Sequence, residues 1–190
     1  MGSTQPRVKG VAFRTIEACY AELRGTDARD QARQLMPSEL GDLYRAGLML
    51  AASWYPIDWY RDALQAFRAA TKEGPELARN IGYQAVKRDM TSVYKSIFAK
   101  IVSPQTLLSI SGRLFNHYYD TGVFEVLESR RGHVLARLSG CLGWDLNMWT
   151  EVYGSCVCFL EIAGAEDVRL QLKSGGRDGD TSMELEAHWT

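Results

Sequence analysis

One short segment carries side chains that could do acid–base chemistry. The segment "RLFNHYYDTG" contains His117 and Asp120, three positions apart near the predicted end of a helix. Side chains at that spacing share a helix face, and an aspartate often orients a catalytic imidazole. No G-x-S-x-G elbow accompanies the pair in the sequence. We therefore interpret both residues as closing the helix, where a cationic histidine suits the helix dipole, and predict no catalytic residue.

The cysteines form no pattern typical of a metal site. Structural zinc sites use two pairs of ligands, and the members of a pair are usually two to four residues apart. Here "CVC" has one residue between its cysteines, and the other two cysteines stand alone. We expect buried thiols and no metal site. The four residues are Cys19, Cys141, Cys156 and Cys158.

Composition places the chain among ordinary globular proteins. It has 190 residues, of which 46% are hydrophobic and 24% charged, and the predicted organisation is a single domain over residues 1–190. The net charge of −1 gives no electrostatic case for a nucleic-acid partner. The longest apolar runs, such as "GLMLAASWY", are too short for a membrane span, and the start lacks a signal-peptide layout. We predict a cytoplasmic protein.

The helical part is expected at about residues 10–121. The segment "GVAFRTIEACYAEL" predicts a helix ended by Gly25, and "SELGDLYRAG" predicts one with Ser38 as its N-cap. In "YPIDWYRDALQAFRAATKEG", Pro56 is expected in the first turn of a helix. The long segment that follows has an apolar stripe at 90–101 and predicts a central helix. A further helix begins at Ser103 and ends near "NHYYDTG".

The remaining part, about residues 122–190, changes to the alternating pattern of strands. Four strands are expected at 123–129, 133–139, 167–174 and 182–189. Each clear strand has one polar face, which is typical of an antiparallel sheet with one wet side. The helix between the two hairpins is expected to begin at Asp145 as N-cap and to bury Trp149. The predicted class is α+β, with a helical N-terminal half packed on a four-stranded antiparallel sheet and a β-β-α-β-β C-terminal half.

Several segments together carry a resemblance to a known family. They are "VKGVAFRT", "WYPIDWYRDAL", "GPELARNIGYQAVKRD", "LFNHYYDTG", "GC-x-GWD-x-NMW", "CFLEIAGAEDVRLQL" and "ELEAHW". Over nearly its whole length the chain resembles a large myxobacterial paralogous family of unknown function. More distantly it resembles the 4-vinyl reductase domain, the small subunits of the TRAPP trafficking complex and the heme-NO-binding domain. That resemblance implies helices on a twisted sheet ending in β-β-α-β-β, and a fold alone implies no function.

Heme binding is tested by the motifs of the heme-NO-binding family. That family has a proximal histidine on a helix and a Tyr-x-Ser-x-Arg motif whose side chains grip the heme propionates. His117 is the histidine expected on a helix, and "YKSIF" supplies Tyr94 and Ser96 but has Phe98 where the arginine belongs. We therefore expect no heme and no other cofactor.

Aromatic side chains gather where the helical half should meet the sheet. In the distant relatives this interface holds a hydrophobic ligand or a partner subunit, and an apolar concavity with a few polar groups is the usual small-molecule site. The predicted ligand-binding residues are Trp54, Trp59, Phe98, Phe115, His117, Tyr119 and Trp144.

These patterns favour a non-enzymatic sensor or adaptor module. We expect it to bind a partner protein or a second copy of itself, as a homodimer, and to hold a small apolar ligand at the helix–sheet interface. A basic stretch at 75–103, with five basic and two acidic residues, offers a surface for an acidic partner. The alternative hypothesis is a heme-binding or other cofactor-binding sensor domain.

Overall fold

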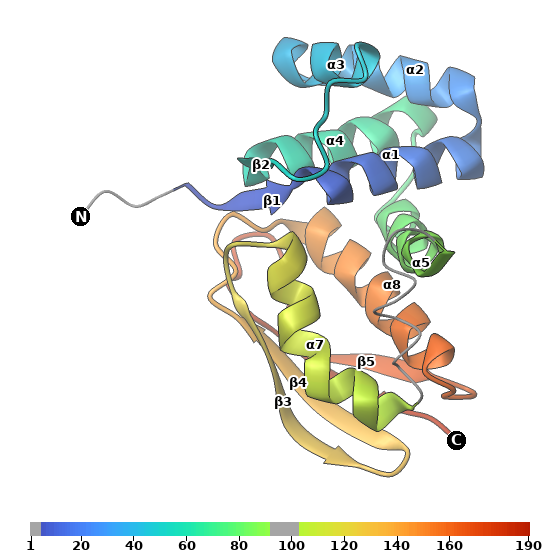
Figure 1. Ribbon diagram of the computed structural model, residues 1–190, viewed down its shortest axis with the longest axis vertical. Helices are drawn as coiled ribbons and strands as arrows, with labels where there is room; N and C mark the ends of the chain where they lie inside the picture. Colours follow the sequence, from blue (N-terminus) through green and yellow to red (C-terminus); the bar gives the residue numbers. More distant parts are fainter. Residues whose placement is uncertain (1–4, 92–102) are drawn as a thin grey trace.

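The structure, a computed structural model, describes residues 5–91 and 103–190 (Figure 1). Helices and strands follow one another in the order β1, α1, α2, α3, β2, α4, α5, α7, β3, β4, α8, β5, β6. The helices are α1 (Gly10–Arg24), α2 (Thr26–Leu35), α3 (Ser38–Arg45), α4 (Ile57–Thr71), α5 (Glu76–Thr91), α7 (Pro104–Tyr118) and α8 (Leu146–Ile162). The strands are β1 (Arg7–Lys9), β2 (Trp54–Pro56), β3 (Val123–Arg130), β4 (His133–Ser139), β5 (Arg169–Gly175) and β6 (Met183–His188).

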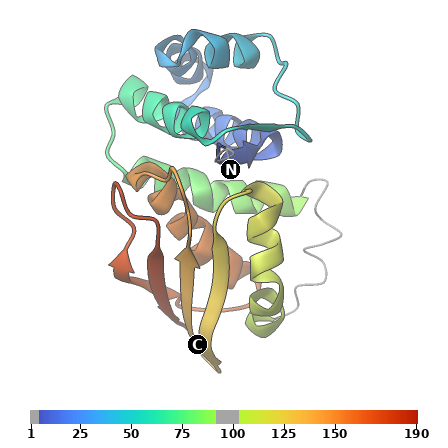
Figure 2. The ribbon, with the colours of Figure 1, turned by 90° about the vertical axis from the view of Figure 1, so that its left-hand side faces the viewer.

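The predicted four-stranded antiparallel sheet is confirmed. Its strand order is β3-β4-β6-β5, so the two hairpins join through β4 and β6 (Figure 2). Successive side chains of a strand point to opposite faces, and on β4 Val134, Ala136 and Leu138 are buried. Helices α7 and α8 cover this inner face, as Figure 1 shows. The α+β class and the β-β-α-β-β order are therefore as predicted.

The helices stack in layers above the sheet (Figure 1). Helix α5 packs against α8, α1 packs against α5 with α4 beside it, and α2 and α3 form the layer farthest from the sheet. One hydrophobic core joins the layers, with Phe13, Phe67 and Trp149 among its fully buried side chains. Trp149 therefore faces the core, as the predicted stripe of α8 requires.

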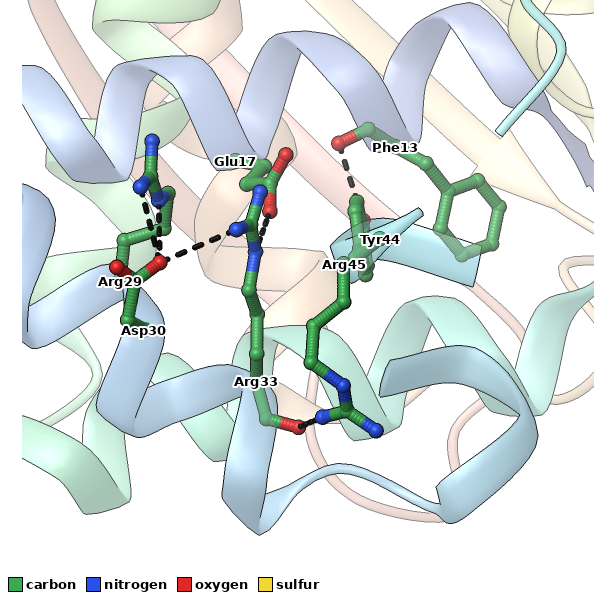
Figure 3. Close-up of polar contacts among 7 residues, drawn as sticks. All are labelled: Phe13, Glu17, Arg29, Asp30, Arg33, Tyr44 and Arg45. Atoms are coloured by element: carbon green, nitrogen blue, oxygen red, sulfur yellow. Dashed lines mark hydrogen bonds and ion pairs between the residues drawn. The ribbon is translucent and has the colours of Figure 1, made fainter. Parts of the chain in front are cut away.

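Polar contacts fasten α2 and α3 to α1 (Figure 3). The guanidinium of Arg33 donates to the carboxylate of Glu17 at 2.6 Å, and both side chains are only 16% exposed. The hydroxyl of Tyr44 donates to the carbonyl oxygen of Phe13 at 3.1 Å. These bonds hold two short, polar helices in place, and the sequence patterns had not predicted α2.

Helix boundaries follow local chemistry, with two corrections. Asp145 caps α8, as predicted, by accepting from the amide of Met148 at 3.0 Å. Ser38 is not an N-cap, because α3 begins with Ser38 itself and has Pro37 in the capping position. Pro56 ends β2 and precedes α4, so it is not in the first turn.

A second, two-stranded sheet was not predicted. Strands β1 and β2 pair antiparallel, with Val8 opposite Tyr55 and Lys9 opposite Trp54. Three-residue strands are too short to show a period in the sequence. The predicted central helix is α5, and the part of its stripe at 92–101 lies outside the described residues. No helix in residues 5–91 and 103–190 has both the length and the hydropathy of a membrane span.

Candidate ligand-binding cavity

A cavity of about 140 Å³ lies between the helices and the inner face of the sheet. Side chains from α1, α4, α5, α7, α8 and all four strands of the larger sheet line it. An engineered protein cavity of about 150 Å³ with an apolar lining holds benzene. The void in this protein is therefore the size of one small aromatic ring.

The wall is mostly apolar, and its side chains recur at the regular spacing of a helix or strand face. Helix α7 contributes Leu107, Leu114 and Phe115, whose spacing of seven and one residues places them on one helix face. Strand β4 contributes Val134 and Ala136, which are two residues apart and so share the inner face of the sheet. The sequence thus specifies an apolar surface on each element, and packing leaves a void where these surfaces meet.

Glu151 is a buried carboxyl in this wall. Its side chain projects from α8, and the residue is 4% exposed. It accepts hydrogen bonds from the hydroxyls of Tyr119 at 3.2 Å and Ser155 at 3.4 Å. The pKa of Glu151 is raised to about 7, chiefly by burial and also by the nearby charge of Asp89, while the two hydroxyl bonds oppose the rise. This carboxyl therefore holds its proton more tightly than an exposed glutamate does.

Asp89 of α5 adds a second carboxyl to the wall. It accepts from the hydroxyls of Tyr118 at 2.7 Å and Thr15 at 3.2 Å, and it is 7% exposed. Burial raises its pKa, and both hydroxyl bonds lower it. The described residues of the cavity wall include no lysine, arginine or histidine. The polar part of the wall is therefore acidic.

Two of the predicted ligand-binding residues line the cavity and a third lies behind them. Phe115 and Tyr119 are in the wall. Trp144 is 3% exposed and packs with its ring centroid 5.8 Å from that of Phe115 and 4.9 Å from that of Tyr119. It supports the two wall residues and is not itself among the lining side chains.

The other predicted ligand-binding residues are not in the described wall. Trp54 is in the small sheet, where the ammonium of Lys9 lies 5.5 Å from its ring centroid. Trp59 stacks on Tyr55 at 6.1 Å. His117 packs edge-on against Tyr118 at 5.2 Å. These side chains belong to the joint between the β1–β2 sheet and α7, and Phe98 lies outside the described residues.

His117 and Asp120 have separate surroundings. Asp120 accepts from both the backbone amide and the guanidinium Nε of Arg7, each at 2.6 Å. Burial, aided by the charge of Lys9, lowers the pKa of His117 from its ordinary value of 6.5. His117 does lie in the last turn of α7, as predicted, and the lowered pKa disfavours its cationic form. The interaction with the helix dipole stays a prediction.

The polar residues of the wall were not predicted from the sequence. Glu151 lies among the apolar residues of α8, and no other acidic residue occurs between Leu146 and Val157. A lone acidic residue in so apolar a helix is a signal for a buried carboxyl. Asp89 gave no such signal, because Lys87 and Arg88 precede it within the stretch at 75–103 that was interpreted as a basic surface.

One cluster on the outer face of the sheet has metal-ligating side chains. His133 Nε2 lies 3.1 Å and His188 Nε2 3.6 Å from Oε1 of Glu186. Lys173 donates to the other oxygen of Glu186 at 2.8 Å. Bonds from Lys173 and His133 lower the pKa of Glu186 to about 2. The lysine already supplies the countercharge, so we interpret the cluster as cross-strand pairing between β5, β6 and β4.

No protein-family model and no curated protein matches this chain. Solved structures of H-NOX (heme-NO-binding) domains do match it. The Fe(II) unliganded H-NOX protein from K. algicida has a TM-score of 0.73 at 16% identity, over 96% of each chain. An oxygen-binding H-NOX domain related to soluble guanylate cyclases, in its oxygen complex, has a TM-score of 0.72 at 12% identity, over 96% of this chain and 95% of that one. A mutant of the T. tengcongensis H-NOX domain has a TM-score of 0.69 at 14% identity, over 96% of this chain and 97% of that one.

The likeness shows that this chain has the fold of H-NOX domains. At 12–16% identity it shows the fold alone. It agrees with the resemblance to the heme-NO-binding domain and covers both the helical half and the sheet. The resemblances to the myxobacterial family, the 4-vinyl reductase domain and the TRAPP subunits stay predictions.

Proposed function

We propose that this chain is a non-enzymatic sensor domain that binds one small, largely apolar molecule in the cavity between its helices and sheet. The observation that carries the proposal is the benzene-sized void with an apolar wall. A ligand that fills it restores the missing dispersion contacts and so stabilises the fold.

The alternative, a heme sensor, has the support of the fold. The solved domains with this fold include an Fe(II) H-NOX protein, and H-NOX domains are named as heme-NO-binding domains. A porphyrin is several times larger than benzene, however, and a cavity of about 140 Å³ between the described wall residues favours a smaller ligand.

The side chains of the described wall do not fit heme either. Iron in hemes is held by histidine, thiolate, methionine or tyrosine. Burial raises the pKa of Cys156 to about 12, so its sulfur is a thiol, and it also raises the pKa of Tyr60. The hydroxyls of Tyr118 and Tyr119 already donate to Asp89 and Glu151. The inner face of β4 carries the apolar Val134, Ala136 and Leu138. The two buried carboxyls would also repel propionates.

An absorbance spectrum separates the two functions. The purified chain should show no Soret band and should not gain one after incubation with hemin. Ethylbenzene, at concentrations near its solubility, should raise the unfolding temperature, because it binds only the folded state. Stoichiometric heme in the purified protein would replace the proposal with the alternative.

A cavity-filling variant tests where the apolar ligand binds. Ala136→Leu adds bulk to the inner face of β4 and should abolish stabilisation by ethylbenzene. Leu135→Phe adds bulk to the opposite face of the same strand and should leave the stabilisation by ethylbenzene unchanged. Equal responses of the two variants would show that ethylbenzene binds elsewhere.

We also propose that the domain reports its ligand to a protein partner or to a second copy of itself. The absence of a catalytic role is supported by Asp120, which is bound to Arg7 and so does not orient the imidazole of His117. Native mass spectrometry with and without ethylbenzene tests self-association. A constant monomeric mass in both would leave a different protein as the partner.

A further inference from the structure

We propose that the ligand of this cavity is a small amine, an aromatic ring or short chain whose ammonium group binds the carboxylate of Glu151. The inference rests on the proposed function, because it names the chemical class of the molecule that the cavity takes. It follows from the position, the partners and the charge of one buried side chain.

The carboxyl of Glu151 lies in the wall with hydrogen-bonding capacity to spare. An ionised carboxylate has about four acceptor positions. The described residues supply two hydroxyl donors, Tyr119 at 3.2 Å and Ser155 at 3.4 Å, and both bonds are long for an O–H donor. A charged N–H donor in the cavity would form a shorter and stronger bond than either.

Glu151 has no ion pair with any residue in the described ranges 5–91 and 103–190. Burying a carboxylate without a countercharge is costly, and the usual remedies are protonation or a bound cation. The raised pKa of Glu151 corresponds to the first remedy, protonation. A ligand ammonium would supply the second.

The rest of the polar wall has the same preference. The negative charge of Asp89 raises the pKa of Glu151. The same charge would attract a ligand cation. The aromatic rings of Tyr60 and Tyr119 also border the cavity, and the face of an aromatic ring attracts cations. A ligand carboxylate would be repelled by both wall carboxylates when they are ionised.

The size of the void sets the size of the ligand. About 140 Å³ holds one six-membered ring or a chain of similar volume. Phenethylamine, ethylbenzene and 3-phenylpropionate share a phenyl ring and an ethylene chain and differ in the group at the end. They carry a positive charge, no charge and a negative charge, and so separate the contribution of charge from that of apolar burial.

The experiment measures binding of these three compounds by calorimetry at about pH 8, where Glu151 is ionised and an alkylamine is protonated. Phenethylamine should bind about tenfold to a hundredfold more tightly than ethylbenzene, and 3-phenylpropionate should not bind. This comparison uses the unaltered protein and depends on no variant.

A pair of variants assigns the preference to one residue. Glu151→Gln removes the charge and keeps the shape, so phenethylamine should bind no more tightly than ethylbenzene. Glu161→Gln removes an exposed carboxylate farther along α8 and should retain the amine preference. Binding of ethylbenzene to Glu161→Gln should equal that to the unaltered protein.

The outcomes distinguish the two levels of the proposal. If ethylbenzene binds as tightly as phenethylamine, or if Glu151→Gln keeps the amine preference, the amine inference is wrong and the apolar cavity function stands. If none of the three compounds binds to the unaltered protein, the proposed function itself is wrong.

Discussion

Gly82 of α5 and Gly154 of α8 lie where the two helices cross, and each contacts the backbone of the other helix. A Cβ atom added to Gly82 would lie 2.0 Å from the carbonyl oxygen of Glu151. One added to Gly154 would lie 2.0 Å from the carbonyl oxygen of Arg79. The absence of side chains at both positions lets the helices pack closely, and this contact fixes Glu151 relative to α5.

The close crossing predicts that Gly82→Ala destabilises the fold. Helix propensity alone would favour alanine by ~0.5–1 kcal/mol. Because the added methyl group meets backbone that cannot move aside, we expect a net loss of at least ~1–3 kcal/mol. Urea denaturation measures it. Gly74→Ala is the control, since a Cβ atom there meets nothing within 4 Å, and its stability should stay equal or rise slightly.

Trp149→Ala should be among the most destabilising single substitutions. The side chain is 1% exposed and packs with its ring centroid 4.6 Å from that of Trp144. Loss of its burial and the cavity left behind should cost ~3–5 kcal/mol. Trp54→Ala, in the partly exposed small sheet, should cost clearly less. Equal midpoints for the two variants would contradict the packing of α8 described above.

Much of this fold was predictable because its elements follow regular periods. The alternation in the hairpins predicted the sheet, and Asp145 and Gly25 marked helix ends by their capping chemistry. Elements without a period were missed. Strands β1 and β2 have three residues each, and α2 is mostly polar and held by the Arg33–Glu17 pair.

The cavity was only partly predictable, since it depends on how separate elements meet. Phe115 and Tyr119 were chosen as aromatic residues near the helix–sheet joint, and they do line the void. Trp54 and Trp59 satisfy the same rule in the sequence but belong to the other side of that joint. The sequence cannot distinguish these two pairs of aromatic residues, because only the tertiary packing decides which aromatic side chain borders the cavity.

His117→Ala should change neither stability nor ligand binding much. The imidazole packs on Tyr118 and is not among the residues of the described cavity wall. We expect a loss of about 1 kcal/mol or less and unchanged stabilisation by ethylbenzene. Phe115→Leu reshapes the wall and should alter that stabilisation. A His117→Ala protein that no longer responds to ethylbenzene would place the histidine in the site after all.

Chelation should leave the fold intact. The cysteines lack zinc spacing, and in the His133–Glu186–His188 cluster Lys173 neutralises the carboxylate. Dialysis against EDTA should therefore not shift the thermal unfolding midpoint. His188→Ala serves as the matched variant, because it removes one ligating side chain from an exposed position. A midpoint that falls on chelation in the unaltered protein, and not in the variant, would reveal a metal at this cluster.

Glu151 should make stability depend on pH above the acid range. Its folded-state pKa of about 7 exceeds the ordinary 4.5, so the folded protein binds this proton more tightly than the unfolded chain. Its contribution to stability is therefore greatest below about pH 4.5 and is lost as pH rises to about 7, by at most ~1.4 kcal/mol per pH unit. The lowered pKa of His117 acts in the opposite direction near pH 6, so a variant is needed to isolate Glu151.

The measurement compares Glu151→Gln with the unaltered protein by urea denaturation at about pH 5 and pH 8. Near pH 5 the folded protein holds Glu151 protonated, and the two proteins should be about equally stable. At pH 8 the unaltered protein carries the buried charge, so the variant should be more stable, by a few kcal/mol at most. Glu161→Gln should show the same difference from the unaltered protein at both pH values. A Glu151→Gln difference that does not change with pH would mean that this carboxyl is ionised throughout, and the acidic character assigned to the cavity wall would need a different source.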